Sequence, residues 1–139
     1  MRSFSQVTHP HLYTLELSYE DIVDEDLSFL RDIHTLNLEE CTQITDHGLQ
    51  SLQGVHALNL SDCSQVTDYG LRYLRDIHTL ILCNCHQVTG DGLQYLQGIH
   101  TLQLSGCFQI TDHELQHLRG IHTLDLWDGP QITDDGLQY

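Results

Sequence analysis

The stretch "CTQITDHGLQSLQGVHALNL", residues 41–60, recurs with small changes along the rest of the chain. It returns as "CSQVTDYGLRYLRDIHTLIL" from Cys63, as "CHQVTGDGLQYLQGIHTLQL" from Cys85 and as "CFQITDHELQHLRGIHTLDL" from Cys107. Each copy begins 22 residues after the previous one. A fixed period of this length is typical of repeat proteins, in which each unit packs only on its neighbours.

Other residue types keep the same spacing. A leucine pair separated by one residue recurs at Leu36/Leu38, Leu58/Leu60, Leu80/Leu82, Leu102/Leu104 and Leu124/Leu126. An earlier unit, "LYTLELSYEDIVDEDLSFL", fits with one residue fewer and without the cysteine. We therefore expect one domain over residues 1–139, with repeats from about 12, 33, 55, 77, 99 and 121. The last repeat is truncated, and residues 1–11 are expected to form an N-terminal cap.

Each unit combines one strand pattern with one short helix pattern. The segment "IHTLNL" alternates apolar and polar residues, which is typical of a half-buried strand. The segment "TDHGLQSL" opens with helix-capping residues and places Leu49 and Leu52 on one helical face. A single unit cannot bury its own apolar face, but stacked units can. The pattern therefore predicts an α/β solenoid of about six 22-residue repeats whose strands pair in parallel.

The unit I-x-x-L-x-L-x-x-C-x-Q-[IV]-T-D-x-G-L-x-x-L resembles a leucine-rich repeat of the cysteine-containing subtype, as found in F-box/LRR proteins. The resemblance covers residues 12–139. It implies a curved right-handed superhelix, with a parallel sheet on the concave face and short helices or 3₁₀ segments on the convex face. The unit of 22 residues is shorter than the family's usual length of about 26, and no F-box segment precedes the repeats.

The charge of the chain restricts its partners. Twenty acidic residues face five arginines, which gives a formal net charge of −15. Such a surface repels phosphate, so it favours a basic protein partner over nucleic acid or an anionic membrane, while solubility alone is an equally good explanation of the charge. The sequence shows no membrane-spanning stretch and no signal peptide, which predicts a cytoplasmic or nuclear location. An odd count of five cysteines fits a reducing compartment better than a disulfide framework.

Most of the recurring polar residues are interpreted as structural. A zinc site needs ligands that converge on one point, whereas one cysteine per repeat places the sulfur atoms along a line. We expect each thiol to fill a small space and to donate a weak hydrogen bond to a turn carbonyl. The recurring glutamines should bond to neighbouring turns, and the recurring threonines should cap helices. Those threonines are Thr45, Thr67, Thr89, Thr111 and Thr133.

One histidine per repeat begins each strand from the second onward. Stacked imidazoles could bind a transition metal or protonate together near pH 6. Duplication of the repeat explains the row without a ligand, so we predict no metal site and no cofactor. The histidines are nevertheless the metal candidates of this chain: His34, His56, His78, His100 and His122.

Positions that differ between repeats are the candidates for function, because packing dictates the positions that recur. They point outward from the strands or follow them directly, and Trp127 is the only tryptophan. The predicted partner-binding residues on the concave face are Glu39, Glu40, Asn59, Asp62, Ile81, Cys83, Gln103, Asp125, Trp127 and Asp128.

The sequence thus predicts a non-enzymatic protein-interaction module, because no nucleophile lies beside a unique His and Asp in a distinctive motif. One alternative is the substrate-recognition part of an F-box-type ubiquitin-ligase adaptor. A second alternative is a metal- or pH-responsive scaffold that uses the histidine row. The sequence ends inside the sixth helix, so either the protein continues or the uncapped edge pairs with another copy to form a homo-oligomer.

Overall fold

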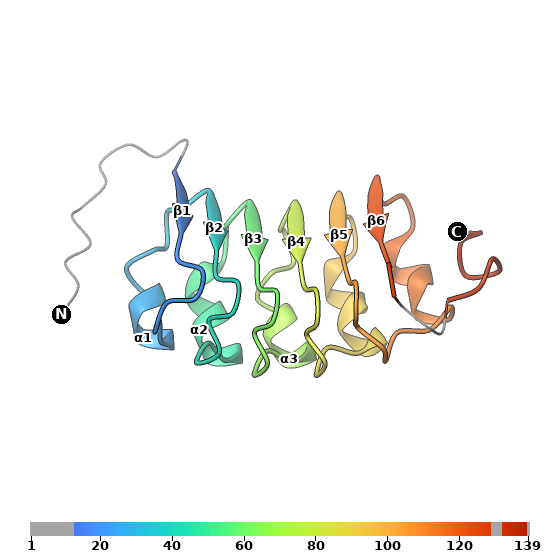
Figure 1. Ribbon diagram of the computed structural model, residues 1–139. Helices are drawn as coiled ribbons and strands as arrows, with labels where there is room; N and C mark the ends of the chain where they lie inside the picture. Colours follow the sequence, from blue (N-terminus) through green and yellow to red (C-terminus); the bar gives the residue numbers. More distant parts are fainter. Residues whose placement is uncertain (1–12, 129–131, 139) are drawn as a thin grey trace.

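The computed structural model describes residues 13–128 and 132–138, so the expected N-terminal cap over residues 1–11 lies outside the described residues. Six three-residue strands form one parallel sheet in the order of the sequence (Figure 1). They are β1 (Thr14–Glu16), β2 (Thr35–Asn37), β3 (Ala57–Asn59), β4 (Thr79–Ile81), β5 (Thr101–Gln103) and β6 (Thr123–Asp125). The central leucine of each strand pairs with the central leucine of the next, from Leu15 to Leu124. The predicted solenoid of six stacked units is therefore confirmed.

Short helical segments return the chain from one strand to the next, on the side of the sheet away from the viewer in Figure 1. The segments are α1 (Asp24–Leu27), α2 (Asp46–Leu49), η1 (Gln50–Leu52), α3 (Asp68–Leu71), η2 (Gly90–Leu96) and η3 (Glu114–Leu118). The α-helices have only four residues each, and the 3₁₀ segments η2 and η3 replace them in later repeats. A 22-residue unit leaves room for little more than one turn, as expected. None of the described helices is long and apolar enough to cross a membrane.

The core is one continuous apolar stack between the sheet and the helical segments. Leu38, Leu60 and Leu82 are fully buried just beyond their strands, and Ile44 and Val66 close the stack from the far side of the turn. At β6 the leucines Leu124 and Leu126 are only partly buried, as is Ile132. The apolar positions of the repeat therefore form the core as predicted, and burial decreases at the last strand.

The recurring cysteines and glutamines connect neighbouring repeats. Each buried thiol donates to the carbonyl that follows the preceding strand, for example Cys63 Sγ to Leu38 O at 3.2 Å and Cys85 Sγ to Leu60 O at 3.1 Å. Gln65 Nε2 likewise donates to Thr42 O at 2.6 Å in the repeat before it. All five cysteines are free thiols. The structural interpretation is confirmed for the four buried cysteines, and among the described glutamines for Gln65, Gln87 and Gln109.

An aspartate of one repeat binds the threonine of the next. Asp46 accepts two hydrogen bonds from Thr67, from its backbone N at 2.8 Å and from its Oγ1 at 2.6 Å. The same pair of bonds joins Asp24 to Thr45 and Asp68 to Thr89. These carboxylates approach so closely that a Cβ added at Gly70 would lie 2.4 Å from Asp46 Oδ1. Glycine in that position is therefore a steric requirement of the pairing.

One repeat departs from this arrangement, and the predicted capping role of Thr111 is wrong. The aspartate that should bind it is replaced by Gly90, and η3 begins after His113 without a side-chain cap. Glu114, which occupies the usual glycine position, supplies the carboxylate instead. Its Oε2 accepts from Thr111 N at 3.0 Å and from Thr111 Oγ1 at 2.6 Å. The side chain of Glu114 fills the space that the missing aspartate leaves, since a Cβ at Gly90 would lie 2.2 Å from Glu114 Cγ.

Candidate protein-binding surface

The sheet has an outward side that no described element covers, which we call the sheet face. Strand pairing places the residue after each central leucine in one row across this face: Glu16, Asn37, Asn59, Ile81, Gln103 and Asp125. A second row follows two residues later and contains Glu39, Ser61, Cys83 and Trp127. The structure thus brings Asn59, Ile81, Gln103, Asp125, Cys83 and Trp127 of the predicted site onto one surface.

Several of these side chains also stabilise the turns that follow the strands. Asn59 Oδ1 accepts from Ser61 N at 2.9 Å and from Ser61 Oγ at 2.7 Å. Asp125 Oδ1 accepts from Trp127 N at 3.0 Å in the same manner. Asn59 and Asp125 are therefore oriented by local hydrogen bonds, which leaves fewer of their polar atoms for a partner.

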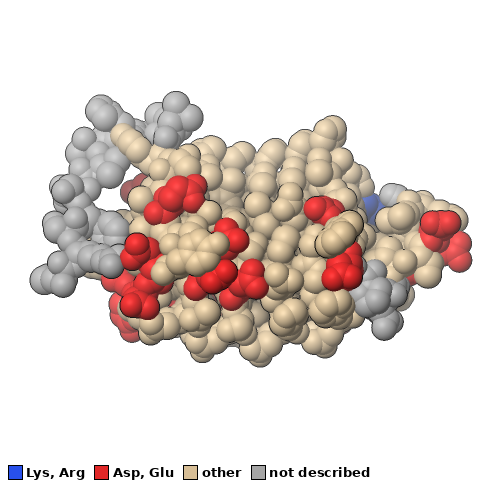
Figure 2. All heavy atoms as spheres, in the orientation of Figure 1, with Lys and Arg blue, Asp and Glu red and all other residues tan. Residues whose placement is uncertain are grey.

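Acidic side chains on this side of the molecule gather near its two ends, and basic ones are almost absent from it (Figure 2). Trp127 is 79% exposed beside Asp125 and Asp128. At the opposite end Tyr19 is 67% exposed. The negative charges of Glu39 and Glu40, then burial and Asp62, raise the pKa of Tyr19. Glu39 and Glu40 lie in the neighbouring turn, where Glu39 O accepts a hydrogen bond from Tyr19 N at 2.9 Å.

Tyr19 is a candidate binding residue that sequence reasoning missed. It belongs to the first unit, which is one residue shorter than the others, so its alignment with Glu40 and Asp62 is easily lost. The backbone shows the equivalence, because all three have positive φ angles of 61°, 58° and 61°. The repeated Tyr/Glu/Asp position after the strand was the signal that could have identified it.

The histidine row lies at the other edge of the sheet, where the strands begin. Neighbouring rings are stacked with centroids 4.4–4.5 Å apart and interplanar angles of 14–26°. Near-parallel rings direct their nitrogen lone pairs side by side rather than at one ion. Among the described residues, no group of three or more His, Cys, Asp or Glu side chains could hold a metal. Burial, together with the flanking histidines His34 and His78, lowers the pKa of His56.

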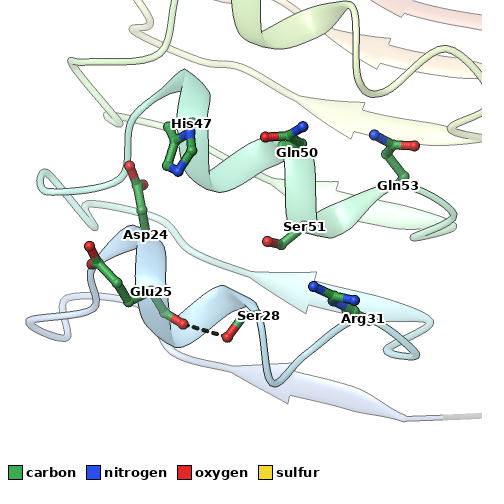
Figure 3. A pocket seen from close by; sticks show the side chains of 8 residues that line it. All are labelled: Asp24, Glu25, Ser28, Arg31, His47, Gln50, Ser51 and Gln53. Atoms are coloured by element: carbon green, nitrogen blue, oxygen red, sulfur yellow. Dashed lines mark hydrogen bonds between the residues drawn. The ribbon is translucent and has the colours of Figure 1, made fainter.

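The helical side carries a polar groove of about 580 Å³ between the first two helical segments (Figure 3). Its eight lining residues include Asp24, Glu25, Arg31 and His47. The Asp24 carboxylate already accepts two hydrogen bonds from Thr45, and Ser28 Oγ donates to Glu25 O at 2.7 Å. All eight lining residues have polar side chains, and Asp24 already accepts from Thr45, so this groove lacks the apolar lining of a typical small-molecule site.

Comparison with known proteins places the fold. No protein-family model matches the sequence, and no curated protein matches it. Among solved structures, one chain of the yeast Rad7 and Elc1 complex is similar, with a TM-score of 0.67 and 20% identity over 78% of this chain and 31% of that one. A chain of the Drosophila Toll–Spatzle complex is also similar, with a TM-score of 0.55 and 13% identity over 80% of this chain and 19% of that one. This protein thus spans less than a third of either chain, and its fold is that of a leucine-rich-repeat α/β solenoid.

Proposed function

We propose that this protein is a non-enzymatic interaction module whose sheet face binds a basic protein partner. The observation that carries the proposal is the exposure of Trp127, which is 79% accessible on a face that no described element covers. Large aromatic side chains surrounded by polar residues are typical anchors of protein interfaces. Among solved chains, a similar one occurs in the Rad7 and Elc1 complex, which supports a protein as the partner.

Charge supports a basic partner. The chain carries a net charge of −15, and acidic side chains gather at both ends of the sheet face in Figure 2. Opposite charge on the partner would accelerate association and orient the complex. The interpretation as part of an F-box-type ubiquitin-ligase adaptor, in contrast, rests only on the resemblance of the repeat. The parallel histidine rings give no support to the metal-responsive scaffold.

The test compares affinity capture by the wild-type chain with capture by Trp127→Ala and by Phe29→Ala. Phe29 is a matched control, because it is 73% exposed but follows α1 on the helical side. We expect Trp127→Ala to weaken binding of the captured partner at least tenfold, about 1.4 kcal/mol, and Phe29→Ala to leave it unchanged. If Trp127→Ala captured the partner as well as the wild type and Phe29→Ala do, the sheet face would not be the binding surface.

A further inference from the structure

Two exposed aromatic side chains mark the two ends of the sheet face. Tyr19 lies three residues after the end of β1, and Trp127 lies two residues after the end of β6. Both belong to the same line of turns, since Tyr19 N donates to Glu39 O at 2.9 Å and Gly106 N donates to Trp127 O at 3.3 Å. They therefore lie at one edge of the sheet, separated by the whole width of the stack.

The surface between the two aromatic residues has a different character. Glu39 and Glu40 lie in the turn next to Tyr19, Asp62 lies one repeat further along, and Asp125 and Asp128 flank Trp127. Strands β4 and β5, which lie between the two ends, contribute only uncharged side chains to the two rows of the sheet face, which are Ile81, Cys83, Gln103 and Ser105. An aromatic face next to a carboxylate attracts a guanidinium or ammonium group through both cation–π and charge-assisted contacts. The face thus offers two cation-attracting ends with a neutral centre.

The backbone at these turns favours glycine, yet most of the turns carry a side chain. Tyr19, Glu40, Asp62, Asn84 and Asp128 occupy the left-handed region with φ of 58–61°, and the equivalent Gly106 has φ of 76°. Asp and Asn tolerate this region through local hydrogen bonds, but another residue with a Cβ, such as Tyr19 or Glu40, is strained there by about 1–2 kcal/mol. Packing does not require that strain, because glycine satisfies the same turn at position 106. The largest side chain of the row, Tyr19, is 67% exposed, so its packing does not compensate the strain.

We propose that the sheet face receives an extended segment of the partner that carries two Arg or Lys side chains about seven residues apart. One cation contacts Tyr19 and its carboxylates, the other contacts Trp127, and uncharged residues cross the middle strands. The spacing follows from five strand separations of about 4.8 Å, roughly 24 Å in total. An extended chain covers that distance with about seven residues, at roughly 3.3–3.6 Å each. This inference rests on the proposed binding function of the sheet face and specifies its ligand.

The test uses two fluorescein-labelled peptides of identical composition at physiological salt, with fluorescence anisotropy as the readout. In the first peptide two arginines are separated by six uncharged residues, and in the second they are adjacent. We expect the spaced peptide to bind at least tenfold more tightly, because only it reaches both ends at once. The equal net charge of the two peptides removes any difference due to general attraction by an acidic protein.

Variants of the protein locate the two contacts. Tyr19→Gly and Trp127→Ala should each reduce the affinity for the spaced peptide to that for the adjacent one, whereas Phe29→Ala should not change it. Tyr19→Gly relieves the positive-φ strain, so its thermal stability should be at least that of the wild type. A loss of binding by this variant then reports a lost contact rather than a damaged fold.

Three outcomes separate this inference from the function on which it rests. Equal affinities for the two peptides, or full binding by Tyr19→Gly, would overturn the two-anchor arrangement. If the peptide results were negative but Trp127→Ala lost the protein that the wild type captures, the sheet face would remain the binding surface and only the two-anchor arrangement would be rejected. If neither peptide bound and Trp127→Ala captured the same proteins as the wild type, both proposals would fall.

Discussion

Glu114 supplies the carboxylate that the aspartate supplies in other repeats and that Gly90 lacks. This replacement allows a quantitative test of how neighbouring repeats are held together. Replacing Glu114 with glycine restores the repeat consensus locally but removes the acceptor of Thr111 N and Thr111 Oγ1. Hydrogen bonds to a charged group contribute about 1.5–3 kcal/mol each when buried. Because Thr111 is only half-buried, water replaces part of this, and we expect Glu114→Gly to cost about 2 kcal/mol in the free energy of unfolding.

The reciprocal change should also destabilise the protein. The Cβ of Asp in Gly90→Asp would lie 2.2 Å from Glu114 Cγ and 2.7 Å from Glu114 Cβ. The Glu114 side chain must move and two carboxylates must share one site, for which we expect a cost of about 2 kcal/mol. The double variant Gly90→Asp/Glu114→Gly recreates the arrangement of Asp46, Thr67 and Gly70. Its free energy of unfolding should lie within about 1 kcal/mol of that of the wild type. Since the two single variants together would cost about 4 kcal/mol, the coupling energy between positions 90 and 114 is about 3 kcal/mol.

Urea denaturation of the wild type, the two single variants and the double variant measures this double-mutant cycle. Unfolding is followed by far-ultraviolet circular dichroism and by Trp127 fluorescence. Glu114→Gln serves as a control, because the amide keeps an acceptor but loses the charge, so it should cost only about 1 kcal/mol. Additive losses in the double variant would refute the reasoning. Such additivity would mean that Glu114 does not substitute for the aspartate that the other repeats possess.

Two further predictions concern the histidine row and the thiols. Burial and the flanking histidines hold the pKa values of His56 and His100 below 6.5, so the folded chain binds fewer protons than the unfolded chain just below that pH. Stability should therefore fall as the pH is lowered from 7.5 to 5.5, and His56→Gln/His100→Gln should flatten this slope in thermal melts; an unchanged slope would contradict it. Native alkylation followed by mass spectrometry should modify Cys83 alone, since burial raises the pKa of Cys63 to about 12 and that of Cys107 to about 11. In urea all five thiols should react, Cys83→Ser should be inert when native, and rapid native labelling at a second position would count against this assignment.

Much of the fold could be predicted from the sequence because the repeat states each packing rule several times. The alternation around Leu36, Leu58 and Leu80 predicted a row of strands, and the cysteine spacing predicted a line of thiols rather than a metal site. The outward positions of Asn59, Ile81 and Trp127 followed from the same alternation, since side chains of a strand point to opposite faces.

Where the repeats differ, sequence reasoning was less successful. It assigned Thr111 a capping role like that of its counterparts, and it overlooked Tyr19 in the shortened first unit. The role of Thr111 depends on Gly90, 21 positions earlier, which removes the expected aspartate and leaves Glu114 to supply the acceptor. The position of Tyr19 depends on a backbone angle that the shortened unit does not reveal.

The sequence by itself therefore determined that the chain stacks, which residues face the core, and that its surface is strongly acidic. Only the tertiary structure decided which irregular residues meet. Stacking brings Gly90 and Glu114 into contact, so that two departures from the repeat compensate each other, and it places Glu39 and Glu40 in the turn next to Tyr19. The physical reason is that the period determines which positions become neighbours, whereas hydrogen bonding and steric space between adjacent repeats determine what those neighbours do.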